Sequence, residues 1–180
     1  RLDPRGAARL ASSLGFGDLP SVGGGLGLAL ALRLRRFQVE LTGGTWFLRS
    51  IRLNLPGSSG AVFDLWTVAL RGGYVVPAGK WFEVPLLLGA EAGQIHVRGV
   101  ELVGAADTRT PWLAFALAPG LAFVPRPAVA VVLGIDLLVP ATRPRFVVED
   151  VGEIFRSQPV AIRAALGVEI RFPNQRTRSR

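Results

Sequence analysis

The final ordered stretch of the chain, residues 160–172, restricts the possible fold more than any other part of the sequence. Every second position is apolar, giving one face that consists of Val160, Ile162, Ala164, Leu166, Val168, Ile170 and Phe172. The other face carries Arg163, Glu169 and Arg171. Such alternation predicts a β-strand with two chemically opposed faces. The run is longer than an ordinary strand of about 5–6 residues and suits the roughly 9–11 tilted residues that cross a bilayer, so we expect it to span a membrane.

The remaining sequence is also apolar, but it contains no candidate for a transmembrane helix. Hydrophobic residues make up 49% of the chain, and the mean hydropathy is +0.38. The best stretches, residues 22–32 and 128–139, fall short of the roughly 18 apolar residues of a spanning helix, and the second contains Asp136. Such a chain either buries its apolar residues in a soluble core or closes into a membrane barrel.

Turn signals divide the chain into eight alternating segments. The segments are residues 5–17, 22–34, 37–49, 62–76, 81–97, 111–124, 129–139 and 160–172. Tight turns at residues 35–36, 77–80 and 125–127 alternate with long connections at residues 50–61, 98–110 and 140–159. This asymmetry is typical of up-and-down outer-membrane barrels. We therefore predict an all-β fold, an eight-stranded antiparallel transmembrane β-barrel over residues 1–172, followed by a polar tail at residues 173–180.

Aromatic residues gather near the ends of these segments, as in the interfacial girdles of membrane barrels. The predicted girdle consists of Phe37, Phe47, Trp66, Tyr74, Trp81, Phe82, Trp112, Phe123 and Phe172. A soluble ligand-carrying barrel of the lipocalin type is the main alternative fold. It would be apolar inside and polar outside, which is the inverse of the expected arrangement.

With these features, residues 5–172 resemble the small eight-stranded bacterial outer-membrane barrels of the OmpA transmembrane domain and OmpX type. The segment that ends at Phe172 is similar to the C-terminal signal read by the outer-membrane assembly machinery. In that family the chain usually ends at the aromatic residue, whereas here residues 173–180 follow. The resemblance implies a bacterial outer-membrane location, with membrane lipid, lipopolysaccharide and the assembly machinery as partners.

The polar face of the segments predicts a charged interior. It carries the acids Glu40, Glu83, Glu91, Asp136 and Glu169, and the bases Arg33, Arg71, Arg163 and Arg171. An eight-stranded barrel is just wide enough for side chains to fill its interior, and buried charges must be paired. We expect a lumen of salt bridges. A polar channel for ions is the alternative reading of the same residues.

Residues for catalysis or metal binding are scarce. His96 is the single histidine, no serine lies near it in sequence, and the chain has no cysteine. A serine hydrolase requires a nucleophile and a histidine within hydrogen-bond reach, and transition-metal sites usually need several His or Cys ligands. We predict no enzyme activity, no cofactor and no metal. Ser50 and Ser157 are the possible spatial partners of His96 in the alternative of a lipid-modifying barrel enzyme.

The formal charge of +8 is expected to arise from the loops and the tail. Arginines occur in or beside the long connections: Arg49, Arg52, Arg98, Arg109, Arg143, Arg145 and Arg156. Because arginine binds phosphate in a bidentate manner, outer-leaflet lipid is the expected counter-ion, while ordinary solvated charge is the simpler explanation. Nucleic acid is not expected, since the arginines are dispersed and form no basic helix. The sequence thus favours a structural or surface-interaction barrel over a narrow pore or an enzyme, and no feature specifies an oligomeric state.

Overall fold

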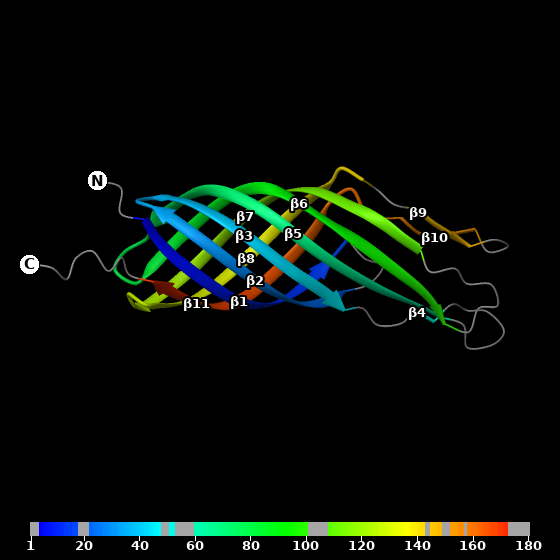
Figure 1. Ribbon diagram of the computed structural model, residues 1–180, viewed down its shortest axis with the longest axis horizontal. Coiled ribbons are helices and arrows are strands. Elements are labelled where there is room, and N and C mark those ends of the chain that lie inside the picture. The colour runs from blue at the N-terminus through cyan, green and yellow to red at the C-terminus, as the bar shows by residue number, and fades with distance from the viewer. Residues whose placement is uncertain are drawn as a thin grey trace, which may run out of the picture.

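The computed structural model is a β-barrel whose strands are tilted against its long axis (Figure 1). It describes residues 4–17, 22–47, 51–52, 60–100, 108–142, 145–148, 152–156 and 158–172. The barrel wall consists of β1 (Pro4–Phe16), β2 (Gly23–Leu34), β3 (Phe37–Phe47), β5 (Gly60–Pro77), β6 (Phe82–Val100), β7 (Thr108–Arg126), β8 (Val129–Pro140) and β11 (Ala161–Phe172). The short β4 (Ile51–Arg52) pairs with the start of β5, and β9 (Arg145–Val148) forms a hairpin with β10 (Gly152–Arg156).

All the strand pairs are antiparallel, and the eight wall strands form a closed circle. Neighbours along the sequence pair with one another, and β3 pairs with β5. The circle closes where β1 pairs with β11, from Gly6 opposite Phe172 to Phe16 opposite Ile162. The predicted eight-stranded antiparallel barrel is therefore confirmed. The β9–β10 hairpin falls within the predicted long connection at residues 140–159, which is therefore partly strand.

The two ends of the barrel differ. The start of β1, the end of β11 and the turns that join β2 to β3, β5 to β6 and β7 to β8 lie at one end, the short-turn end (Figure 1). The strands β4, β9 and β10 lie at the other, the long-loop end (Figure 1). Three neighbouring strands, β5, β6 and β7, have 18, 19 and 19 residues. Since roughly 9–11 residues cross a bilayer, these strands continue well beyond it. The predicted long connections at residues 50–61 and 98–110 are therefore partly strand.

The polarity of the wall is inverted relative to a soluble barrel. Leu30 on β2 is 63% exposed and Leu70 on β5 is 60% exposed, whereas their neighbours Ala29 and Ala69 are buried in the interior. An exterior of this kind is stable in hydrocarbon and not in water. The lipocalin-type alternative is therefore wrong. Among the described residues, no helix is long and apolar enough to cross a membrane.

The aromatic residues of the predicted girdle are exposed, with one exception. Phe37 and Tyr74 meet edge to face with ring centroids 5.8 Å apart beside the short-turn end, and Phe82 and Phe123 lie 5.4 Å apart. Trp112 is the exception and corrects the prediction, because it is 1% exposed. It shares the inward face of β7 with Ala114 and Ala116. Alternate side chains of a strand point to opposite faces, so this alternation, and not the position near a strand end, decides that Trp112 points inward.

The orientation of the wall can be tested by labelling single cysteines, since the chain has none of its own. Cysteine placed at Leu30 or Leu133 should react slowly with a membrane-impermeant maleimide in lipid vesicles, because both positions face outward along the span. Cysteine at Ala78, in the exposed turn after β5, should react rapidly when the reagent is present on both sides. Equal labelling at all three positions would contradict the assigned orientation.

Closure of the barrel predicts that β1 is indispensable although its apolar pattern is weak. Without residues 1–17, the edges of β2 and β11 would expose unpaired backbone groups to lipid, which is costly. The truncated chain should lose the compact, heat-modifiable form on unboiled gels. Deletion of residues 173–180 is the control and should leave that form intact. A truncated chain that still migrates as a compact barrel would show that closure does not depend on β1.

Candidate functional site: the barrel interior

The interior contains matched numbers of acidic and basic side chains. The structure brings together all nine predicted lumen residues, each within an ion pair, and adds Arg9 of β1. Five carboxylates therefore accompany five guanidinium groups. Sequence analysis missed Arg9 because the alternation of β1 is weak. The position of Arg9 between the outward-facing Ala8 and Leu10 nevertheless indicates that its side chain faces inward. Among the described residues, this ion-paired part of the interior consequently carries no net charge.

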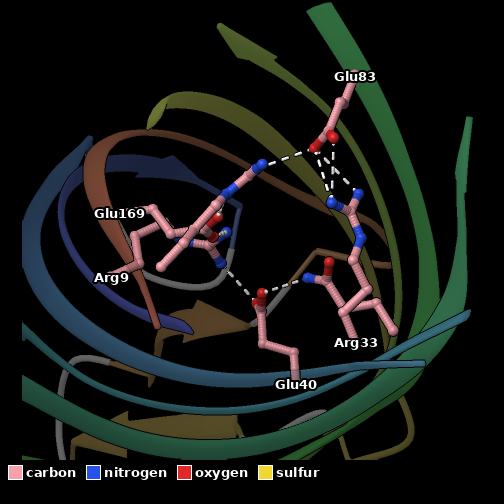
Figure 2. A network of polar contacts seen from close by, with 7 residues as sticks. Arg9, Arg33, Glu40, Glu83 and Glu169 are labelled. Atoms are coloured by element: carbon pink, nitrogen blue, oxygen red, sulfur yellow. Dashed lines mark hydrogen bonds and ion pairs between the residues drawn. The ribbon is translucent and has the colours of Figure 1, made fainter. Parts of the chain in front are cut away.

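One part of the network surrounds Glu40 (Figure 2). Arg9 reaches from β1 across β2 to the carboxylate of Glu40 on β3, with Nη2 and Oε1 2.5 Å apart. The side-chain amide of Gln38 donates to the other oxygen at 3.2 Å. Arg9 also lies 3.7 Å from Glu169 on β11. Because Glu40 is 1% exposed, these donors replace the water that its charge would otherwise require.

Glu83, at the start of β6, links a second group of strands (Figure 2). Its carboxylate accepts hydrogen bonds from Arg33 of β2 at 3.0 Å and from Arg171 of β11 at 2.9 Å. The Nε of Arg171 donates to Glu169 at 2.8 Å. Glu169 thereby joins this group to the Glu40 group. The resulting chain of ion pairs fastens strands that are distant in sequence to one another.

Further along the lumen, Arg71 of β5 and Asp136 of β8 form a bidentate pair. The two N–O distances are 2.9 and 2.8 Å. The strands are separated by β6 and β7 in the sheet order, so the pair crosses the lumen. A cavity of about 100 Å³ lies beside it, lined also by Arg9, Glu40 and Glu91.

Toward the long-loop end, a buried group centres on Glu91 of β6. One oxygen accepts from Arg163 at 2.7 Å and the other from the indole Nε1 of Trp112 at 2.8 Å. The guanidinium of Arg163 lies 4.4 Å from the ring centre of Trp46, a cation–π distance. The absence of a side chain at Gly25 makes room for Trp46, since a Cβ at Gly25 would lie 2.8 Å from the ring. Both members of the ion pair are 2% exposed.

An apolar cluster surrounds this group and fills the same end of the lumen. It consists of Trp46, Leu65, Ile95, Trp112, Ala114, Ala116, Leu138 and Ala161. Sequence analysis predicts a polar interior throughout and gives no indication of this apolar cap. The inward parity of two large indoles near the ends of β3 and β7 was the available signal. The lumen is thus an ion-paired core with an apolar cap.

The described part of the chain provides little for catalysis. His96 lies outward on β6, in register between Asp64 of β5 and Arg109 of β7. The described serines nearest a strand centre, Ser12 and Ser13, are on β1, half the barrel circumference away. The suggested partners Ser50 and Ser157 lie outside the described residues. Likewise, within the described ranges, no group of three His, Asp or Glu side chains could hold a metal ion.

Comparisons with known proteins identify the fold. No protein-family model matches the sequence, and comparison with curated proteins gives no match. Solved structures do match over nearly the whole chain. A major outer membrane protein from Thermus thermophilus superimposes with a TM-score of 0.63 at 14% identity, covering 93% of this chain and 99% of that one.

Two further structures agree with this result. Ail, the attachment invasion locus protein of Yersinia pestis, gives a TM-score of 0.60 at 15% identity over 96% of this chain and 100% of its own. Neisserial surface protein A gives 0.60 at 12% identity over 94% and 97%. The fold is that of a small bacterial outer-membrane β-barrel. At such low identity the likeness concerns the fold, and the predicted resemblance to these barrels is confirmed at that level.

The cross-lumen pair predicts a large cost for removing one partner. Asp136→Ala leaves the buried guanidinium of Arg71 without its carboxylate and should lower the free energy of unfolding by about 3–5 kcal/mol, measured by urea titration in lipid vesicles. The double variant Arg71→Ala/Asp136→Ala should lose less than the sum of the single losses. Asp64→Ala, which removes a carboxylate from the outer face, is the control. Strictly additive losses would show that the two groups are not coupled.

Proposed function

We propose that this chain is a structural or surface-interaction protein of a bacterial outer membrane, without catalytic activity and with a closed lumen. The observation that carries the proposal is the filled interior. Five acids and five arginines are paired with one another, and an apolar cap occupies the long-loop end. An interior of this kind contributes to stability rather than to transport, because moving an ion through it requires opening buried pairs.

The long-loop end supports a role in surface interaction. There β5, β6 and β7 extend beyond the length needed to cross a bilayer, and the β9–β10 hairpin adds further strand structure. Arg109 is exposed on the outer face of this extension. Ail has been solved in complex with the heparin analogue sucrose octasulfate. We accordingly propose anionic partners at this end, with lipopolysaccharide phosphate as the first candidate, since arginine binds such groups well.

The assembly machinery of the outer membrane is a second proposed partner. The last strand, β11, ends at Phe172, which is 55% exposed on the outer face. Its alternating face ends in an aromatic residue, as the signal for that machinery requires in the family the chain resembles. The proposal concerns β11 and makes no use of the residues that follow it.

A narrow pore is the alternative function, and the cavity of about 100 Å³ beside Arg71 and Asp136 is the observation in its favour. A continuous path would have to pass the cap that includes Trp46 and Trp112. An enzymatic role has less support, since His96 lies outside the lumen without a described serine near it.

Planar-bilayer conductance separates the closed barrel from the pore. The unmodified protein should give little or no steady current. Trp46→Ala should raise the current, because it removes a large ring from the cap. Trp66→Ala is the matched control, because that indole is 53% exposed on the outer face. Large, steady single-channel currents from the unmodified protein would overturn the closed-lumen proposal and favour the pore.

A further inference from the structure

The short-turn end of the lumen contains a strongly cationic cavity. Its volume is about 360 Å³, and its lining includes four arginines, Arg5, Arg33, Arg35 and Arg36, with Glu83 as the acid. The arginines come from the start of β1, the end of β2 and the turn that follows β2. Four positive charges and one negative charge leave the lining with a formal excess of three. This excess of positive charge distinguishes the cavity from the rest of the interior, where acidic and basic side chains are equal in number.

The single acid is already occupied. Glu83 accepts hydrogen bonds from both Arg33 and Arg171. Within the described part of the chain, Arg5, Arg35 and Arg36 take part in no ion pair. Arg5 and Arg33 are directly opposite in the β1–β2 register, so two like charges face each other across one rung. Like charges directly opposite one another are destabilising, and Glu83 offsets the charge of Arg33 while Arg5 has no acid of its own among the described residues.

The turn itself departs from ordinary hairpin chemistry. Arg35 has a positive φ of 56°, at a position that two-residue hairpin turns usually fill with Gly or Asn. The carbonyl of Arg36 accepts a hydrogen bond of 2.7 Å from the backbone N–H of Val75 at the end of β5. The turn is thereby fixed against the neighbouring strand. Both arginine side chains are exposed, and they are held at the edge of the cavity.

We propose that this cavity is a binding site for a phosphate group at the short-turn mouth of the barrel. Guanidinium groups bind phosphate through paired, charge-assisted hydrogen bonds, and a volume of this size can hold a small ligand. In outer-membrane barrels the short turns lie on the periplasmic side. The exposed Phe37 and Tyr74 rings beside the turn are of the kind that lies at the lipid headgroup level. The phosphate can therefore belong to a phospholipid headgroup or to a soluble phosphate ester.

Two binding measurements on the full-length folded barrel test the site. Isothermal titration with inorganic pyrophosphate in uncharged detergent tests a soluble phosphate. Retention of phosphatidylglycerol from mixed micelles, detected by native mass spectrometry, tests a headgroup. The variant Arg35→Gln/Arg36→Gln should weaken at least one of these interactions by roughly tenfold or more, as expected for losing charged hydrogen bonds. Both side chains are exposed, so the variant should keep its heat-modifiable form.

The matched control removes the same charge from the same end of the barrel. Lys80→Gln/Arg126→Gln changes two exposed residues, one in the turn after β5 and one at the end of β7, and neither residue lines the cavity. If only the cavity variant loses pyrophosphate binding, the ligand of the site is a soluble phosphate. If only the cavity variant loses phosphatidylglycerol retention, the ligand is a lipid headgroup. Equal weakening by both variants would overturn the site in favour of general charge attraction. Failure of the unmodified protein to bind either probe would also overturn it.

Discussion

The structure depends on the hydrogen bonds between β1 and β11. In hydrocarbon every backbone N–H and C=O group needs a partner within the protein, so a sheet can cross a membrane only if it has no open edge. The pairing from Gly6–Phe172 to Phe16–Ile162 provides that closure and joins the two ends of the chain. Closure fixes the number of strands, and the number of strands fixes the width of the lumen. The narrow lumen in turn requires that every inward charge buried within it be paired.

The ion pairs of the lumen are consequences of this geometry. Three of the arginines lie on adjacent strands of the closed sheet, β1, β2 and β11. The carboxylates that pair with Arg9, Arg33 and Arg171 come from β3, β6 and β11. Each inward charge is matched there, so the net charge of the chain lies elsewhere. At the short-turn mouth the matching stops, and Arg5, Arg35 and Arg36 remain as a cationic rim around a cavity. The contrast between a neutral interior and a charged mouth separates the part of the lumen that stabilises the barrel from the part proposed to bind phosphate.

The wall could be predicted closely because its pattern is local. Alternation in residues 160–172 gives a strand within one residue of β11, and the tight turn predicted at residues 35–36 lies between the end of β2 and the start of β3. Strand ends were less predictable. Residues 98–110 have no clear alternation, and part of this stretch becomes strand because β5, β6 and β7 support one another beyond the bilayer. Trp112 was misplaced for a related reason, since its position near a strand end suggested a girdle while its parity directs it inward.

The sequence by itself determined the side on which each wall residue lies, because the two-residue period of a strand is a property of the backbone. It also determined which charges share the lumen, apart from Arg9. Only the tertiary structure decided which acid meets which arginine, since the stagger of strands around a closed barrel sets those distances. It also decided that Trp46 and Trp112 meet around Arg163 and Glu91 to form an apolar cap, and that four arginines surround one cavity. These arrangements join residues from strands far apart in the chain, and no local pattern records them.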